Sequence, residues 1–327
     1  MKLQSIYLLL VPALLSVSSC SDPEHSGFEQ VPIELRASGN GEVIAKADYQ
    51  EITESFETTI FASKRNGIYT GIPSDADPDE WQKDATVQTS GSVSLPDNPT
   101  YPENGDWIYL VAVAPKTSAY NSSDGSVSYT LTGQTDLMYA KQIRGNRWDG
   151  SRFSNTDNTK DIPLEYVHQL TQLKFKAQKV ASGGLAVKVK SITIKGQETV
   201  KVDLASGKAT FSGDAVELKL TPANGETEIV TAPSATDLGC LLLPPLEPEQ
   251  AYQLTVETSI GTFENLDISF DSTSGGGSSS SSGSNHFAAG HSYEITLNIG
   301  DRELEILSVT VAQWTTVKQK NDLELIK

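Results

Sequence analysis

Cys20 is the residue whose surroundings most clearly predict a chemical modification. Lys2 supplies a positive start, residues 6–15 form a short apolar run, and the small residues 17–19 lead into Cys20. The run is far shorter than the roughly 20 residues of a membrane-spanning helix. The pattern predicts a lipoprotein signal peptide, residues 1–19, and a lipidated Cys20 (carrying palmitate, for example) that holds the protein on a bilayer. The alternative is an ordinary signal peptide followed by an incidental cysteine.

Elsewhere the chain offers little that could perform catalysis or bind a metal. Its four histidines are scattered, and the motifs HExxH, GxSxG, CxxC and GxxxxGK[ST] are absent. The acidic loop at Asp75 reads DADPD and resembles the start of a calcium loop, but Glu80 and Thr86 stand where that loop needs glycine and glutamate. Cys240 lies in an apolar stretch and is expected to be a buried hydrophobic residue. We expect no enzyme activity, no metal and no cofactor, although a carboxylate pair for glycoside hydrolysis would leave no spacing signal.

The composition sets further limits. The chain has 42 acidic and 25 basic residues, a net charge of -17, which disfavours nucleic acid as a partner. Its two cysteines are Cys20 and Cys240, so a lipidated Cys20 leaves none for an internal disulfide. The length of 327 residues allows two domains.

Alternation of apolar and polar residues dominates the chain and predicts half-buried β-strands. The alternating apolar sets are Val31, Ile33 and Leu35; Leu173, Phe175 and Ala177; Tyr252, Leu254 and Val256; Tyr293, Ile295, Leu297 and Ile299; Leu307, Val309 and Val311; and Leu323 with Leu325. The continuous apolar run 108–113 suits a strand that is covered on both faces. A phase shift between Val189 and Ile192 predicts a β-bulge, and residues 165–170 form at best one helical turn. These patterns predict an all-β, mainly antiparallel protein built of sandwiches.

Turn-forming residues divide the strands and suggest the domain organisation. We expect a tether at residues 20–30, a first β-sandwich domain at 31–163 and a second at 164–327. Residues 275–284, GGGSSSSSGS, have nothing to bury and are expected to form a flexible loop inside the second domain.

Four segments carry a family resemblance. Residues 136–140 (DLMYA) are followed by 162–170 (IPLEYVHQL), and the chain closes with 289–297 (AGHSYEITL) and the strand 307–314, which ends in tryptophan. These segments resemble the fimbrillin family of Bacteroides-type bacteria, which includes type V pilins and fimbrillin-like surface lipoproteins. The resemblance implies two transthyretin-like antiparallel β-sandwich domains in tandem. It also implies a type V pilus subunit that lies at the outer membrane and the fimbrium and supports cell adhesion.

The same resemblance gives the first strand a role. Val31, Ile33 and Leu35 can fill an apolar groove, and Arg36 follows them directly. The resemblance implies that a surface protease cuts between Arg36 and Ala37, so that the first strand leaves and a strand of a neighbouring subunit replaces it. The alternative is a permanent edge strand with Arg36 as an ordinary surface residue.

The donor strand is expected at the other end of the chain. Leu323 and Leu325 form a short apolar alternation beyond Trp314 that could enter the groove of the next subunit. Its alternative role is to close its own domain. The partners expected are therefore other pilin subunits, the outer membrane through the lipid on Cys20, and a host protein or glycan.

A second function stays open on the sequence alone: a monomeric surface lipoprotein that serves as an anchor, tip adhesin or glycan-binding module. Trp81, Trp107 and Trp148 lie in or beside polar loops, where aromatic rings could stack on sugars. Trp314 is expected to anchor a core at a strand end. His168 is expected to be a hydrogen-bonded residue rather than a metal ligand.

Overall fold

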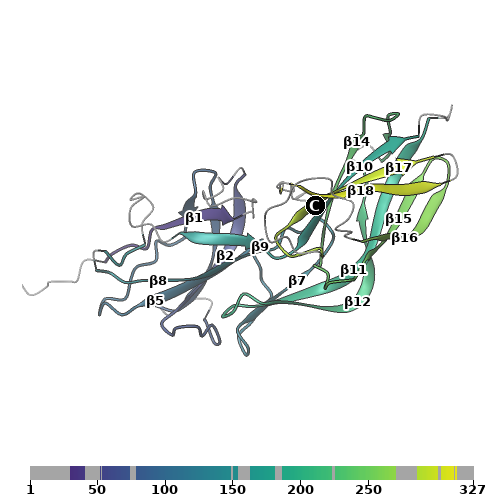
Figure 1. Cartoon of the computed structure of the whole chain (residues 1–327). Helices are drawn as coiled ribbons and strands as arrows, with labels where there is room; N and C mark the ends of the chain where they lie inside the picture. Colours follow the sequence, from purple (N-terminus) through teal and green to yellow (C-terminus); the bar gives the residue numbers. More distant parts are fainter. Residues whose placement is uncertain are drawn as a thin grey trace, which may run out of the picture. The chain divides into compact units, whose positions relative to one another are not determined.

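The secondary structure of the described residues consists of β-strands, as the sequence predicts. The structure is a computed structural model (Figure 1). It describes residues 30–40, 52, 54–73, 79–148, 150–153, 163–180, 186–222, 225–269, 286–300, 303–312 and 314. Across these residues no helix is found that is long and apolar enough to cross a membrane.

Seven strands form a closed barrel. In spatial order they are β1 (Leu35–Asn40), β4 (Ser92–Ser94), β3 (Trp81–Val87), β2 (Phe56–Ser63), β5 (Ile108–Ala114), β8 (Met138–Gly145) and β9 (Leu164–His168). Neighbouring strands are antiparallel except β1 and β9, which run parallel and close the barrel. The mainly antiparallel pairing that the sequence predicts is present in the barrel, and the parallel pair could not be located in advance because alternation along one strand does not report the direction of its partner.

The barrel strands β2 and β5 are covered on both faces. Ile60 on β2 and Leu110 on β5 belong to the core inside the barrel, whereas Phe61 and Val111 belong to a second core on the outer side. This arrangement confirms the two-sided burial predicted from the apolar run 108–113.

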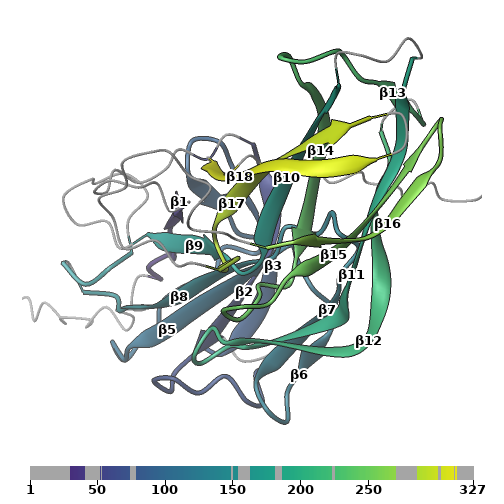
Figure 2. The same ribbon diagram turned by 45° about the vertical axis from the view of Figure 1, so that its right-hand side comes forward.

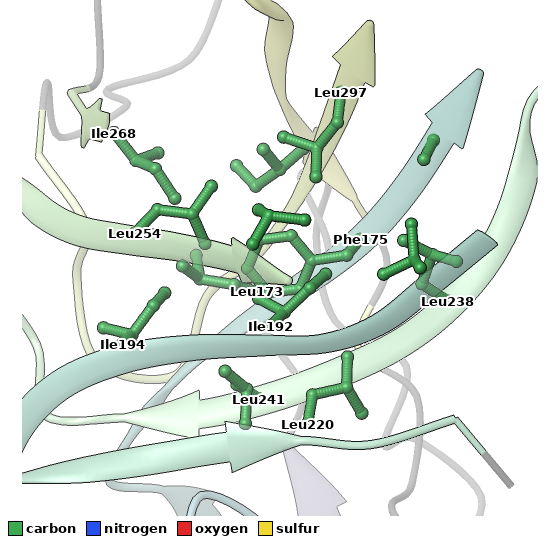
Figure 3. Close-up of a cluster of buried hydrophobic side chains, with 14 of the residues drawn as sticks. Leu173, Phe175, Ile192, Ile194, Leu220, Leu238, Leu241, Leu254, Ile268 and Leu297 are labelled. Carbon is green, nitrogen blue, oxygen red and sulfur yellow. The ribbon is translucent and has the colours of Figure 1, made fainter. Parts of the chain in front are cut away.

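Two further sheets pack face to face. The first contains, in order, β14 (Thr236–Leu243), β10 (Thr171–Lys179), β17 (Ser292–Ile299) and β18 (Leu304–Ala312). The second contains β16 (Thr262–Ile268), β15 (Tyr252–Thr258), β11 (Lys188–Asp203), β7 (Ser126–Thr130) and β6 (Tyr120–Asn121), while β12 (Ala209–Leu220) and β13 (Thr227–Glu228) also pair with β11. Leu173 and Phe175 of β10 meet Ile192 of β11, Leu254 of β15 and Leu297 of β17 in a shared core (Figure 3). The predicted bulge is confirmed, since the pairing of β11 with β15 shifts register between Val189 and Ser191.

The long strand β11 connects the two halves of the chain. Its first part pairs with β15, and its last part pairs with β7 from the N-terminal half (Figure 2). Val200 and Val202 of β11 lie in one core with Phe61 of the barrel. The β7 pairing therefore crosses the boundary expected at 163/164, and β9, just beyond that boundary, belongs to the barrel. Loop composition locates interruptions between strands, but it does not reveal which strand a segment pairs with.

Residues 165–170 do not form the short helical turn that the sequence allows at most. Leu164 and Tyr166 are buried at 0% and 1% exposure, whereas Glu165 and Val167 between and beyond them are more exposed. This two-residue period makes β9 a strand, and its pairing with β1 and β8 stabilises it.

Candidate functional site

The first strand of the chain occupies a slot between β4 and β9. Leu35 and Arg36 pair with Val93 and Ser92 of β4. Further along, β1 leaves β4 and pairs in parallel with β9, where Ala37 is the partner of Leu164 (Figure 1). Without β1 the barrel would be an open sheet with β4 and β9 as its two edges.

Backbone hydrogen bonds to neighbouring segments also hold β1 and the residues just before it. Ile33 N–H donates to Pro99 O over 2.8 Å, and Tyr101 N–H donates to Val31 O over 2.9 Å. Ala37 N–H donates to Gly91 O over 2.7 Å. A second extended chain in this slot could accept and donate the same hydrogen bonds, whatever its side chains.

The side chains of this segment complete the barrel core. Ile33, Leu35 and Ala37 are exposed by 5%, 1% and 4%, and the half-buried Val31 packs against the same cluster. Glu34, between them, is exposed. At about 1.5–3 kcal/mol for a large apolar side chain, burial of Val31, Ile33 and Leu35 stabilises the barrel by roughly 5–8 kcal/mol before ordering costs. The slot is therefore an apolar groove that selects alternate apolar residues.

Tyr166 of β9 forms part of the wall of this groove. Its hydroxyl lies 2.8 Å from Thr58 Oγ1, which donates to Val113 O over 2.7 Å. Its ring meets Phe56 edge-on at 5.1 Å between centroids. Burial raises the pKa of Tyr166 well above its ordinary value, so the hydroxyl stays neutral. The groove wall thus carries no charge from this residue across the physiological pH range.

Gly91 allows β1 to approach the turn before β4 closely. Its φ is +81°, and a Cβ at this position would lie 2.8 Å from Ala37 O. A side chain here would therefore strain the turn and push against the backbone of β1.

We expect Gly91→Ala to lower the free energy of unfolding by about 2–4 kcal/mol, because a left-handed backbone and a backbone clash both oppose it. Gly67→Ala is the matched control, since Gly67 has a φ of +68° but open space around a Cβ. It should cost only about 1 kcal/mol. Urea unfolding measures both values. Hydrogen exchange should show faster exchange of the Ala37 amide in Gly91→Ala alone, and equal effects of the two variants would contradict the close approach.

Arg36 and Ala37 lie inside β1, which corrects the expectation that Arg36 directly follows the first strand. Both residues have backbone partners, Ser92 for Arg36 and Leu164 for Ala37. The strand continues because the odd-numbered positions remain inward through the small residue Ala37, which the sequence pattern did not identify as a core position. The peptide bond between Arg36 and Ala37 is therefore protected while β1 is paired.

His168, the last residue of β9, contacts Trp314, which lies beyond the end of β18. Its Nδ1 is 2.7 Å from Asp136 Oδ1, which confirms the predicted hydrogen bond. Its ring stacks on Trp314, with 3.9 Å between centroids and 22° between planes. Trp314 is half-buried and packs against the core that also contains Phe61. The predicted anchoring role of Trp314 therefore agrees with its packing.

The remaining predicted residues are dispersed or lie outside the described part of the chain. Trp81 is 3% exposed and points into the barrel core, so the expectation that it could stack on a sugar is wrong. Cys240 is half-buried rather than buried, and burial raises its pKa to about 11, which keeps the thiol protonated at neutral pH. The residues outside the described part are Cys20, Asp75, Asp77, the loop 275–284, Leu323 and Leu325.

Sequence reasoning found the inserted side chains but missed both partner strands. The short strand β4 has one apolar residue, Val93, and the pattern of residues 165–170 allows at best a short helical turn. An available signal was the alternation of Leu164 and Tyr166. Gly91 carried no signal beyond its place in the turn-forming run 89–92.

Comparisons with known proteins agree with this architecture. The model of a family described as fimbrillin-like matches residues 50–314. No curated protein matches the chain. A solved structure of a candidate cell-adhesion protein from Bacteroides uniformis is similar, with 17% identity and a TM-score of 0.54 over 87% of this chain and 98% of that chain.

Two other solved structures are also similar. One is a candidate cell-adhesion protein from Bacteroides ovatus, with 16% identity and a TM-score of 0.54 over 88% of this chain and 98% of that chain. The other is a candidate polysaccharide-binding protein from Bacteroides thetaiotaomicron, with 11% identity and a TM-score of 0.51 over 89% of this chain and 99% of that chain. At these identities the likeness establishes a shared fold.

Proposed function

Because the chain belongs to the fimbrillin-like family, we propose that it is a subunit of a bacterial surface fimbrium, a type V pilus, and that it supports cell adhesion. Its role is structural rather than enzymatic. The barrel and the two packed sheets correspond, in this proposal, to the tandem transthyretin-like domains of the family. The observation that carries the proposal is the position of β1 between β4 and β9.

Assembly proceeds by strand exchange in this proposal. Departure of Val31, Ile33 and Leu35 opens an apolar groove with unpaired backbone groups along β4. A tail that carries Leu323 and Leu325 from another subunit offers alternate apolar side chains and a full set of backbone donors and acceptors. The contact joins two different surfaces, so its repetition builds an open filament rather than a closed dimer.

Processing between Arg36 and Ala37 fits this scheme with one condition. The bond lies inside β1, so a protease must capture a state in which the strand has opened. The cut then removes residues 31–36 from the β4 side of the slot and leaves residues 37–40, which can still pair with β9. The open half-groove along β4 is the receiving site for the donor tail.

The subunit reaches the outer membrane as a lipoprotein in this proposal. Cys20→Ser should leave the signal peptide uncleaved by the lipoprotein peptidase and release the protein from membranes, because the acyl chains supply the binding energy. Fractionation of cells followed by immunoblotting measures both effects. Cys240→Ser, which removes the other cysteine, is the control and should stay with the membrane. Normal processing and unchanged membrane partition of Cys20→Ser would contradict lipidation.

The mature N-terminus on cells tests the proposed function directly. Mass spectrometry of the fimbrial fraction should find chains that begin at Ala37. If all surface chains begin at a lipidated Cys20, the second function is favoured. The protein would then be a monomeric surface lipoprotein that acts as an anchor or adhesin.

A further inference from the structure

Trp148 is an exposed aromatic residue held in a fixed position. Its exposure of 58% is the largest among the exposed large hydrophobic residues that the structure describes. Gly105 packs directly against the indole, since a Cβ there would lie 2.5 Å from Trp148 Nε1. The guanidinium of Arg147 lies over the same ring, 5.6 Å from its centroid. The ring therefore has support from the protein while much of its surface faces solvent.

Hydrogen bonds also hold the described residues around Trp148. Trp148 N–H donates to Asn146 Oδ1 over 3.0 Å, and Ser151 N–H donates to Trp148 O over 3.0 Å. Arg147 is only 8% exposed and donates from Nη1 to Glu103 O over 2.5 Å. Because these bonds hold the backbone of Trp148 before any ligand arrives, binding there costs less conformational entropy than binding to an unbonded loop.

A second tryptophan and arginine pair lies at the same end of the barrel. Ile108, the first residue of β5, pairs with Gly145, the last residue of β8. Trp107 directly precedes this pair in the chain and is half-buried. The exposed Arg144 places its guanidinium 4.8 Å from the centroid of Trp107. The aromatic ring thus holds an accessible cation in place beside the loop of Trp148.

Arginine is concentrated in this region, where three basic side chains are balanced by the acidic residues Glu103, Asp106 and Asp149. Three of the six arginines, Arg144, Arg147 and Arg152, fall within nine residues of a protein whose net charge is -17. Two of them support the loop, since Arg147 bonds to Glu103 O and Arg152 donates from Nε to Arg147 O over 2.6 Å. Arg144 presents a planar donor fork, which suits a carboxylate.

We propose that the loop residues 103–107 and 146–148, with Arg144 beside them, form a binding site for a sugar that carries a carboxylate, such as a uronic or sialic acid residue within a glycan. Trp148 stacks on the apolar C–H face of the sugar ring, and Arg144 binds its carboxylate. The exposed Asn104 and Asp106, joined by a 2.7 Å hydrogen bond from Asn104 Nδ2, supply polar groups for the sugar hydroxyls. This proposal can be tested apart from pilus assembly, because Trp148, Arg144, Asn104 and Asp106 are not among the residues that hold β1.

The surroundings of Trp148 favour a sugar over a protein partner. A stable protein interface buries about 800 Å² per partner around an apolar centre. The other exposed large hydrophobic residues of the described chain, Ile68, Val167, Val230, Leu307 and Val311, lie on other segments. A single aromatic face bordered by polar groups and a cation matches a sugar ring, which has one apolar face and a polar edge.

The test uses residues 21–327 on a printed array of uronic-acid, sialic-acid and neutral oligosaccharides. We expect retention on carboxylated glycans and, for the best of them, a rise in Kd of at least about tenfold in both Trp148→Ala and Arg144→Gln. Trp148→Tyr should keep most of the affinity, because it keeps a stacking face. Ile68→Ala, an exposed apolar residue outside these two loops, is the control and should bind as the unchanged protein does.

Circular dichroism and thermal melting establish that each variant is folded, so loss of binding reports the site. Absence of binding to every glycan, or binding that survives Trp148→Ala, would overturn the proposal. Binding to neutral sugars alone, or binding unaffected by Arg144→Gln, would overturn the role of the carboxylate. Attachment to cells should also be compared before and after enzymatic deglycosylation. If the unchanged protein still attaches to deglycosylated cells and Trp148→Ala does not, the surface binds a protein partner instead of a glycan.

Discussion

Leu35→Ala is expected to lower the free energy of unfolding by about 3–4 kcal/mol, because the side chain is buried in the barrel core and its loss leaves a cavity. Leu35 is 1% exposed and belongs to a strand that closes the barrel. Leu307→Ala is the matched control: the same change at a residue 54% exposed on β18 should cost less than about 1 kcal/mol. Urea unfolding of residues 21–327 measures both.

The same variant links stability to processing. If an arginine-specific protease cuts the Arg36–Ala37 bond only after β1 opens and β1 recloses quickly, the cleavage rate follows the population of the open state. A loss of about 3 kcal/mol should then raise the rate roughly a hundredfold. Limited proteolysis with mass spectrometry of the new N-terminus measures this rate. A destabilised Leu35→Ala that is cut no faster than the unchanged protein would contradict an opening step at β1.

The sequence predicts a strand correctly where the alternation of its own residues is enough to identify it. The alternation at Leu173 and Phe175, the two-sided run of β5 and the bulge at Val189 all follow from side-chain periodicity. The position of Trp81 does not follow from periodicity. Loop residues precede it in the sequence, whereas its pairing with Ala62 places it on β3. Its burial depends on partners that sequence spacing does not reveal.

Of the candidate groove, the sequence predicts only the strand that fills it, not the strands that form its walls. Val31, Ile33 and Leu35 were recognised because they alternate, but the walls come from β4 and β9, which lie far along the chain. Long-range pairing depends on the whole set of strands that must close the barrel. The proposed sugar site shows the same limit: the sequence identifies Trp107 and Trp148 as aromatic residues in or beside loops, whereas their contacts with Arg144 and Arg147 depend on the fold.

Cleavage after Arg36 is expected to convert a monomer into a chain-forming subunit, and deletion of residues 321–327 is expected to abolish that conversion. The groove accepts short apolar alternation, which both the removed strand and the tail provide. The experiment cleaves residues 21–327 after Arg36 and follows particle size by light scattering. Uncleaved protein is the first control and should remain monomeric because β1 fills its own groove.

A disulfide lock provides a sharper control for the same assembly. Pro32 and Thr100 form an antiparallel bridge upstream of the cut, and Cα atoms at such positions are about 4.5–5.5 Å apart, within the range of a disulfide. Pro32→Cys with Thr100→Cys, in a Cys240→Ala background, should keep residues 31–36 in the groove after the backbone is cut. The locked protein should stay monomeric until reductant releases the strand, and should then polymerise. Three outcomes would each contradict exchange at the β1 groove. They are cleaved protein that stays monomeric at high concentration, tail-deleted protein that polymerises equally well, and locked protein that assembles without reductant. The first two would favour the monomeric surface lipoprotein.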